Sequence, residues 1–226
     1  MRVALNVDLG ELEDEPEGLY AAATTVNIAC GGHAGDDASM TKALALAKRE
    51  GCRVSAHPSY PDREGFGRRA RFGDRAALPA SITEQVNRLV VLAERLGTRV
   101  VGLKLHGALY HDASVDPALA AAVLDAARVA APHLEDVTGP QGSEVAVAAS
   151  RAGLRFLREA FADRRYLADG RLAPRSEPGA LLEDPEACAA QALALVARGD
   201  VDSVCVHGDT EGALVIATAV RSALSR

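Results

Sequence analysis

The stretch RVVGLKLH, residues 99–106, has the length and the apolar, β-branched character of a strand. It is one of seven such runs along the chain, and the other six are Arg2–Asp8, Val26–Cys30, Arg53–His57, Glu135–Thr138, Leu154–Glu159 and Asp202–His207. The pattern therefore predicts seven strands.

Longer segments rich in alanine and leucine lie between these runs. Their apolar residues recur at helical spacing, which predicts helices over Asp36–Glu50, Ser81–Leu96, Asp116–Ala131, Glu186–Arg198 and Glu211–Leu224. Ser81 opens a capping-box pattern, whereas Asp116 and Asp184 each stand before a proline, the usual order at a helix start.

Strands that alternate with helices imply a parallel sheet joined by right-handed crossovers. No linker or repeat divides the 226 residues. We therefore predict a single α/β domain over residues 1–226, built as a closed or nearly closed (β/α) barrel, with a doubly wound open sheet as the alternative. The segments Glu11–Tyr20 and Ser59–Leu78 are expected to be loops, and the length of the second suggests a function.

Composition argues against several classes of function. The net charge of −6, the aromatic content of 4% and the lack of tryptophan leave little for nucleic-acid binding, which needs a basic face or stacking rings. No apolar stretch approaches the roughly 20 residues of a membrane span, and the first residues do not form a signal-peptide pattern. The four cysteines are widely spaced and form no C-x-x-C pair. In a chain with a full core and no signal peptide, such cysteines are typically reduced thiols. We expect a cytoplasmic protein without a nucleic-acid or membrane partner.

Ionisable residues gather where the predicted strands end. In parallel α/β folds, ligands bind at the carboxyl ends of the strands. The residues that fall there are Asp8, His33, His57, Lys104, His106, Glu159, His207 and Asp209. A single buried histidine is usually satisfied by the backbone, but a whole set of ionisable groups would be costly to bury for stability alone. These residues therefore predict a functional site.

Lys104 is the most informative of them because it interrupts an otherwise apolar strand. It is either a structural lysine paired with an acid, for which Asp8 and Glu159 are candidates, or a group that stabilises an oxyanion. From the strand position alone, Lys104→Met is expected to lower activity and to change stability little or even to raise it. Two arginines of the long loop, Arg68 and Arg69, are candidates either for clamping a carboxylate or for pairing with acids of their own loop.

Seven motifs run in order along nearly the whole chain: NVDLGE at residues 6–11, NIACGGHAGD at 27–36, AHPSYPD at 56–62, GFGRR at 65–69, KLHGALY at 104–110, EAFADR at 159–164 and CVHGD at 205–209. Together they resemble the LamB/YcsF family, which is also described as the family of 5-oxoprolinase A subunits. The resemblance implies a (β/α)7 barrel of the glycoside hydrolase/deacetylase kind. It also implies ATP-dependent, hydrolytic ring opening of 5-oxo-L-proline to L-glutamate, carried out with partner subunits B and C.

Given this reaction, the residues at the strand ends take candidate roles. Catalysis is assigned to Asp8, His57, Lys104, His106, Glu159 and Asp209, and substrate binding to His33, Arg68, Arg69 and His207. The general base is left open among Asp8, His57 and Asp209. The chain has no G-x-x-x-x-G-K-[ST] motif, so ATP is expected to bind mainly to the partner subunits or at their interface.

Two other functions stay open at the level of sequence. One is a metal-dependent, deacetylase-like hydrolase in which Asp8, His33 and His57 hold one divalent ion. The other is a non-catalytic subunit that only binds 5-oxoproline. The chain lacks H-x-x-x-H and C-x-x-C spacing, and together with the resemblance this predicts no stoichiometric catalytic zinc. Whether another metal binds is left open.

Overall fold

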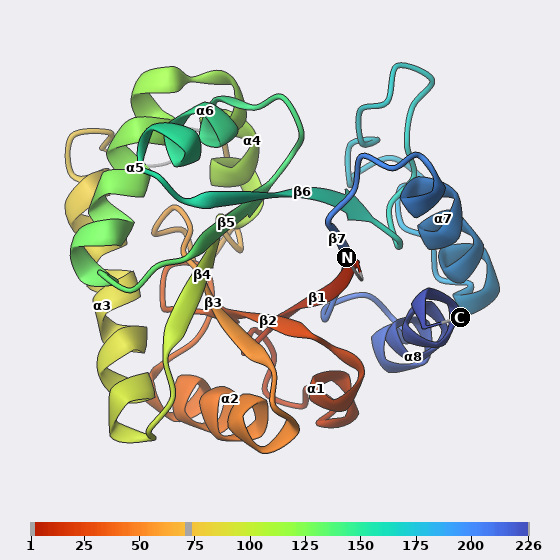
Figure 1. The fold of residues 1–226 in the computed structure, drawn as a ribbon, viewed down its shortest axis with the longest axis horizontal. Coiled ribbons are helices and arrows are strands. Elements are labelled where there is room, and N and C mark those ends of the chain that lie inside the picture. Colours follow the sequence, from red (N-terminus) through yellow and green to blue (C-terminus); the bar gives the residue numbers. More distant parts are fainter. Residues whose placement is uncertain (1–2, 71–73, 226) are drawn as a thin grey trace.

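The computed structural model describes residues 3–70 and 74–225, and its centre is a closed barrel of parallel strands (Figure 1). The strands follow one another in chain order as β1 (Ala4–Leu9), β2 (Thr25–Ala29), β3 (Arg53–His57), β4 (Val100–Lys104), β5 (Asp136–Gly139), β6 (Arg155–Phe161) and β7 (Ser203–His207). β1 pairs with both β2 and β7, so that Val7 lies between Val26 and Val206. The predicted barrel is thereby confirmed, and the doubly wound open sheet is wrong. Arg2, where the first strand was predicted to begin, lies outside the described residues.

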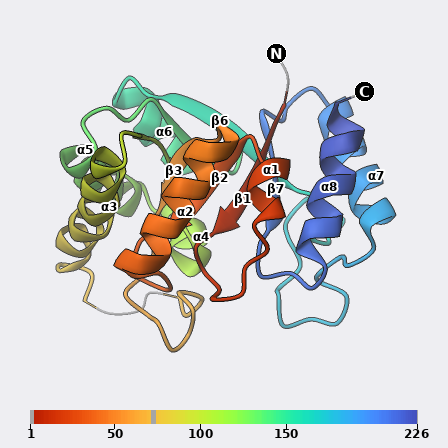
Figure 2. The same cartoon turned by 90° about the horizontal axis from the view of Figure 1, so that it is seen from below.

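Helices cover the outside of the barrel in the part of the chain that the structure describes (Figure 1). They are α1 (Gly18–Ala22), α2 (Asp37–Glu50), α3 (Leu78–Arg95), α4 (Gly107–Val115), α5 (Pro117–Ala130), α6 (Glu144–Arg151), α7 (Pro185–Ala197) and α8 (Ala213–Leu224). Figure 2 shows β1 running toward the end of the barrel that carries the long loops after β3 and β6. That end is therefore the carboxyl end of the parallel strands, where a site is expected.

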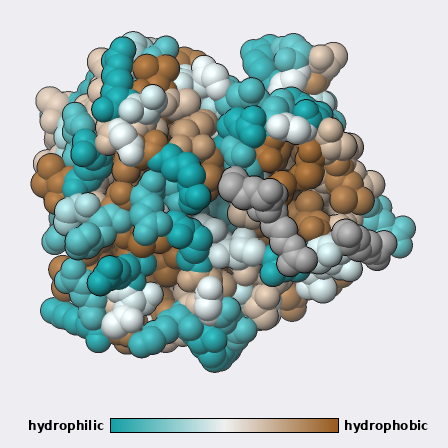
Figure 3. All heavy atoms as spheres, viewed as in Figure 1, coloured by the Kyte–Doolittle hydropathy of each residue, from teal (hydrophilic) through white to brown (hydrophobic). Residues whose placement is uncertain are grey.

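On the face of the molecule that Figure 3 shows, hydrophilic and hydrophobic side chains are mixed. Across the described residues, no helix combines the length and the apolar composition that crossing a membrane would require.

Most helix starts follow the local sequence. Asp116 and Asp184 cap α5 and α7 through side-chain hydrogen bonds to the first turn, each before a proline, as predicted. The start predicted at Ser81 is wrong, because α3 begins at Leu78 and Ser81 lies inside it. Pro79 stands in the first turn, where its missing N–H would have had no helical partner.

Three short helices, α1, α4 and α6, were not predicted, because each has nine residues or fewer and shows too little apolar periodicity. α1 begins inside the segment Glu11–Tyr20, so the prediction of a loop there is wrong for its last residues. α4 begins at Gly107, which has a positive φ of 58°. A Cβ at Gly107 would collide with the carbonyl oxygen of Gly67, so glycine lets the start of α4 lie against the loop after β3.

Alternate strand residues face the helices and the barrel interior. On β1, Leu5 and Val7 are fully buried in the apolar layer beneath the helices. Asn6 and Asp8 point the other way, since successive side chains of a strand alternate between faces. Lys104 of β4 reaches both of them across the interior, with Nζ 3.2 Å from Asn6 Oδ1 and 2.8 Å from Asp8 Oδ1. The barrel therefore encloses a polar interior that leads to the carboxyl end.

Candidate active site

A cavity of about 330 Å³ opens at the carboxyl end of the barrel. The predicted site residues that line it are Asp8, His57, Arg68, Lys104, His106 and His207. Polar and aromatic lining residues that the sequence analysis did not single out are Tyr110, His111, Asp112, Phe161, Arg164 and Arg175. The volume lies at the lower end of the range for small-molecule sites. The structure thus brings most of the predicted residues to one place.

Lys104 lies at the base of this cavity and is 2% exposed. Its Nζ lies 2.8 Å from Asp8 Oδ1 and 3.0 Å from Glu159 Oε1. Burial favours the neutral amine, but the surrounding negative charge, that of Asp8 first, outweighs burial and holds the pKa of Lys104 well above its usual range. Burial also disfavours ionised Asp8, yet Lys104 and His57 hold the pKa of Asp8 well below its usual range. The two residues therefore form a charged, buried pair.

The ammonium group of Lys104 has its donors engaged by protein atoms. Besides the two carboxylates, Asn6 Oδ1 lies 3.2 Å away and Cys205 Sγ lies 3.0 Å away. An ammonium offers three N–H donors, so an oxyanion could bind to it only by displacing one of these partners. Asn27 Nδ2 also donates to Asp8 Oδ1 at 2.8 Å. The geometry thus favours Lys104 as a residue that positions the Asp8 carboxylate.

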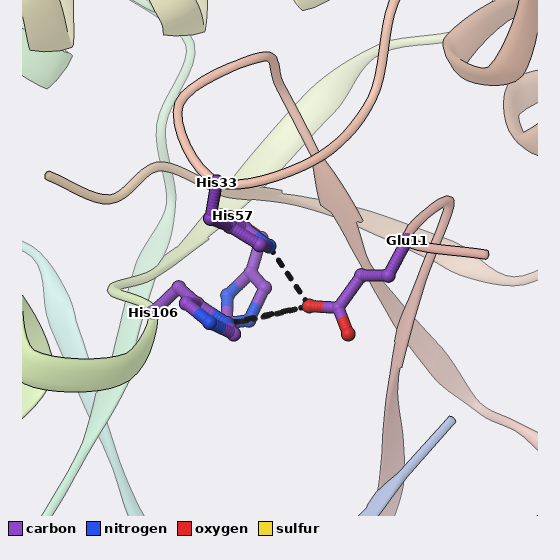
Figure 4. Close-up of side chains that lie close together, drawn as sticks. All are labelled: Glu11, His33, His57 and His106. Atoms are coloured by element: carbon purple, nitrogen blue, oxygen red, sulfur yellow. Dashed lines mark hydrogen bonds and ion pairs between the residues drawn. The ribbon is translucent and has the colours of Figure 1, made fainter. Parts of the chain in front are cut away.

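Three histidines meet one acid beside the cavity (Figure 4). Glu11 Oε1 lies 2.9 Å from His33 Nε2 and 3.3 Å from His106 Nδ1. The same oxygen lies 3.7 Å from His57 Nε2. The sequence analysis placed the three histidines at strand ends but did not select Glu11. Its position in the NVDLGE motif, directly after the first strand, was the available signal.

Burial and charge set the protonation of this cluster. Burial lowers the pKa of His33 to about 3 and also lowers that of His106. Burial acts in the same direction on His57, but the Asp8 carboxylate outweighs it and raises the pKa of His57. Burial disfavours the ionised form of Glu11, but its contacts with His106 and His33 outweigh burial and hold its pKa well below the usual range. A full negative charge therefore lies among rings that are deeply buried.

The long loop after β3 holds one side of the cluster in place. Phe66 has a positive φ of 52°, and no other described residue except glycine does. Its carbonyl oxygen lies 3.0 Å from His106 Nε2, which donates to it. Strained backbone of this kind is found where a functional site requires a particular geometry. The function predicted for this loop from its length is therefore supported at Phe66.

The two arginines predicted in this loop separate in the structure. Arg69 binds Asp62 of its own loop and is not among the described residues that line the cavity. Arg68 does line the cavity, and it pairs with Asp209. The Asp209 carboxylate also accepts two hydrogen bonds from Arg175, at 2.9 and 3.0 Å. The predicted carboxylate clamp of Arg68 and Arg69 is therefore not assembled.

Asp209 is a poor candidate for the general base. Burial raises its pKa, but Arg175 and then Arg68 outweigh burial and lower the pKa of Asp209 to about 2. A carboxylate that holds a proton so weakly is an inefficient acceptor near neutral pH. Asp209 instead holds the two arginines beside the cavity.

We expect Asp209→Asn to lower the free energy of unfolding by about 2 kcal/mol at pH 7. The folded pKa lies below the unfolded value near 4, so the pair stabilises the fold above about pH 4 and this stabilisation is lost as the pH falls toward 2. Urea unfolding of both proteins at pH 7 and pH 3 measures the effect, and the difference should shrink to about 1 kcal/mol at pH 3. An equal difference at the two pH values would show that the Asp209 charge is not the cause.

Two further predicted residues, Glu159 and His33, stand behind the cavity wall, and a third, His207, is part of the wall. Glu159 binds the far side of Lys104, and His33 stacks on the His106 ring with centroids 3.6 Å apart. His207 lines the cavity, and its Nδ1 lies 3.0 Å from both carboxylate oxygens of Asp163. These contacts hold the lining residues in fixed orientations.

Arg164 is the lining residue that the sequence analysis most clearly missed. It is 6% exposed, its Nη2 donates to the Ala173 carbonyl at 2.7 Å, and its Nε has no hydrogen-bond partner among the described residues. Burial and the charge of Arg175 lower the pKa of Arg164, so a bound anion would stabilise the guanidinium. Only its place in the EAFADR motif after β6 pointed to it.

Comparison with known proteins agrees with the seven motifs. The sequence matches the model of the LamB/YcsF family over residues 3–226. A relative from Mycobacterium avium (strain 104), named as the A subunit of 5-oxoprolinase, is 45% identical, with 98% of this chain and 94% of the relative covered. One from Streptomyces avermitilis with the same name is 42% identical, with 98% of this chain and 95% of the relative covered.

The fold agrees as well. The crystal structure of a lactam utilization protein from Thermus thermophilus matches with a TM-score of 0.89 at 35% identity, covering 100% of this chain and 96% of that chain. The sequence match and the shared fold extend over essentially the whole chain. The chain therefore belongs to the LamB/YcsF family.

Proposed function

We propose that this chain is the A subunit of an ATP-dependent 5-oxoprolinase and that it carries out the hydrolytic ring opening of 5-oxo-L-proline to L-glutamate with partner subunits B and C. The observation that carries the proposal is the ionised Asp8, held by Lys104 and Asn27 in the wall of a cavity of small-molecule size. The names of the relatives and of the lactam utilization protein support the choice of a cyclic amide as substrate.

The chemistry explains why ATP is needed. A lactam carbonyl is a poor electrophile because of amide resonance, and phosphorylation of its oxygen makes the ring carbon open to attack by water. One water then adds to the ring carbon and the C–N bond breaks, so that the nitrogen becomes the amine of glutamate and an acyl phosphate remains. A second water releases inorganic phosphate from it. Both steps require a group that removes a proton from water.

Asp8 is the residue that we propose as this proton acceptor. It lines the cavity, it is ionised because Lys104 and His57 hold its pKa low, and its Oδ2 lies 3.5 Å from His57 Nε2. His57 lines the cavity beside it. Lys104 keeps the carboxylate charged and oriented, which makes it a positioning residue for this reaction.

ATP is proposed to bind mainly to the partner subunits or at their interface with this chain. The chain has no G-x-x-x-x-G-K-[ST] motif to hold the phosphates. A cytoplasmic location is also proposed. It is supported by the four cysteines, which are all free thiols.

The proposed function is tested with purified subunits B and C, ATP and 5-oxoproline. Glutamate should form with this chain in the mixture and should not form when the chain is left out. Glutamate formation at the same rate without this chain would contradict the proposal. A mixture in which the Asp8→Asn chain supports full turnover would instead favour the non-catalytic binding subunit.

Arg164 gives a separate prediction on substrate recognition. We expect Arg164→Met to raise the KM for 5-oxoproline about 10- to 100-fold and to leave kcat within a few fold, because charge-assisted hydrogen bonds to the substrate carboxylate are lost. Steady-state kinetics of the three-subunit mixture measures both constants. Arg165→Met is the matched control, since Arg165 is 37% exposed and pairs with Glu177 outside the cavity. A fall in kcat with an unchanged KM would refute the assignment of Arg164.

A further inference from the structure

Two ring nitrogens of the histidine cluster face each other without a hydrogen between them in the neutral rings. His57 Nδ1 lies 2.8 Å from the Lys104 carbonyl oxygen, which only accepts, so this nitrogen carries the hydrogen. In the same way, His106 Nε2 carries the hydrogen that it donates to the Phe66 carbonyl. A neutral imidazole holds one ring hydrogen, so His57 Nε2 and His106 Nδ1 each present a lone pair. They lie 3.0 Å apart, so a cation between them, either a proton or a metal ion, would satisfy both lone pairs.

A carboxylate oxygen completes a set of three donors around the same point. Glu11 Oε1 lies 3.3 Å from His106 Nδ1 and 3.7 Å from His57 Nε2. Neighbouring donor atoms that bind one ion at 2.0–2.2 Å are themselves about 3.0–3.5 Å apart. The His57–His106 and Glu11–His106 separations fall in this range, and the Glu11–His57 separation slightly exceeds it. The two imidazole planes are at 88°, so the lone pairs of both rings can converge on one ion. Each imidazole also donates its other N–H to a backbone carbonyl, as metal-binding histidines commonly do.

His33 has a different part in the cluster. Its ring is parallel to that of His106, with an interplanar angle of 3° and centroids 3.6 Å apart. Two stacked rings in separate parallel planes cannot both direct an in-plane lone pair at the same ion. His33 Nε2 instead lies 2.9 Å from Glu11 Oε1, where its N–H can orient the carboxylate (Figure 4).

We propose that Glu11, His57 and His106 bind one divalent transition-metal ion, with His33 as the residue that positions Glu11. Two imidazoles and one carboxylate form a donor set that suits such ions and leaves further coordination positions open. His57 and His106 line the cavity, so an open position can face it. The proposal concerns binding by this chain alone and does not depend on the proposed reaction. It replaces the expectation from spacing and resemblance that no stoichiometric zinc binds.

Other acidic and histidine groups near the cavity fit a metal less well. Asp8, Cys205 and His207 form a second group of close donors, but the Lys104 ammonium lies 2.8 Å from Asp8 and 3.0 Å from Cys205 and would repel a cation there. For the same reason, the set of Asp8, His33 and His57 considered from the sequence is disfavoured.

The test is metal binding to the isolated, chelator-treated full chain. Calorimetric titration with Zn²⁺ is expected to give one ion per chain with a micromolar or lower Kd, and Zn²⁺ should raise the melting temperature. Co²⁺ in the same preparation should give visible absorption bands typical of nitrogen and oxygen ligation. A proton shared by His57 and His106 would satisfy both lone pairs without a metal, and a correctly folded chain that binds neither ion would overturn the proposal.

Variants identify the ligands. Glu11→Gln and His106→Asn should each weaken binding by more than the 10- to 100-fold typical of losing an outer partner, whereas His33→Phe, which keeps the stacked ring, should weaken it by about that amount. His111→Asn is the matched control, since His111 lines the cavity outside the cluster. Far-UV circular dichroism checks that each variant is folded. Loss of binding in His207→Asn with retained binding in Glu11→Gln would place the ion at the second group and refute the assignment.

Discussion

Replacing Lys104 by methionine is expected to lower turnover of the reconstituted enzyme by about 10²–10³-fold, because the general base that it positions contributes about 10²–10⁴-fold. The stem of the side chain is kept and only the charge is removed. Without the ammonium, no positive charge lies between the carboxylates of Asp8 and Glu159, and both lose the orientation that Lys104 imposes. Steady-state rates of glutamate formation, corrected for folded protein, measure the effect.

The same substitution is expected to destabilise the chain by about 3–5 kcal/mol, the range for breaking a buried ion pair from one side. This replaces the expectation from the strand position alone, which had no partner charges to consider. Adding Glu159→Gln to Lys104→Met removes one of the two stranded charges, so urea unfolding should show part of the stability recovered while activity stays low. Lys42→Met, on the exposed face of α2, is the control for losing a lysine. Turnover within a few fold of the original would remove Lys104 from the site.

Asp8→Asn is expected to cause an even larger loss, about 10²–10⁴-fold in turnover, because the amide cannot accept the proton from water. The side chain keeps its size, and Lys104 keeps Glu159 as a charged partner. The chain should therefore fold and join the partner subunits. Single-turnover measurement of glutamate formation with the assembled mixture separates the chemical step from assembly.

Asp112→Asn is the matched control for Asp8→Asn, since Asp112 lines the same cavity and accepts a hydrogen bond from the Tyr60 hydroxyl at 2.9 Å. It should stay within a few fold of the original turnover. If Asp8 and Lys104 act as one unit, the double variant should lose little more than Asp8→Asn alone. Full multiplication of the two losses would show that Lys104 acts independently of Asp8.

Local sequence determines the scaffold of this protein. Seven apolar runs of strand length alternate with segments of helical spacing, and this alternation predicts the parallel barrel. The runs are apolar because both faces of the strands are buried. The same reading locates the residues at the strand ends, since parallel strands bring those ends together. The three short helices were missed because so few residues carry little periodicity. The start of α3 was misplaced because the capping-box pattern at Ser81 lies inside the helix.

What each residue at the strand ends does is decided only by the tertiary structure. Lys104 and Asp8 are 96 positions apart, so neither spacing nor periodicity could show that they form a buried pair. The same holds for Glu11 and His106, which are proposed to bind one metal ion although they are far apart in the sequence and are not part of an H-x-x-x-H motif. Arg69 pairs with Asp62 of its own loop, whereas Arg164, from the segment after β6, lines the cavity. Charge, burial and lone-pair direction depend on neighbours in space, and barrel closure selects those neighbours from distant parts of the chain.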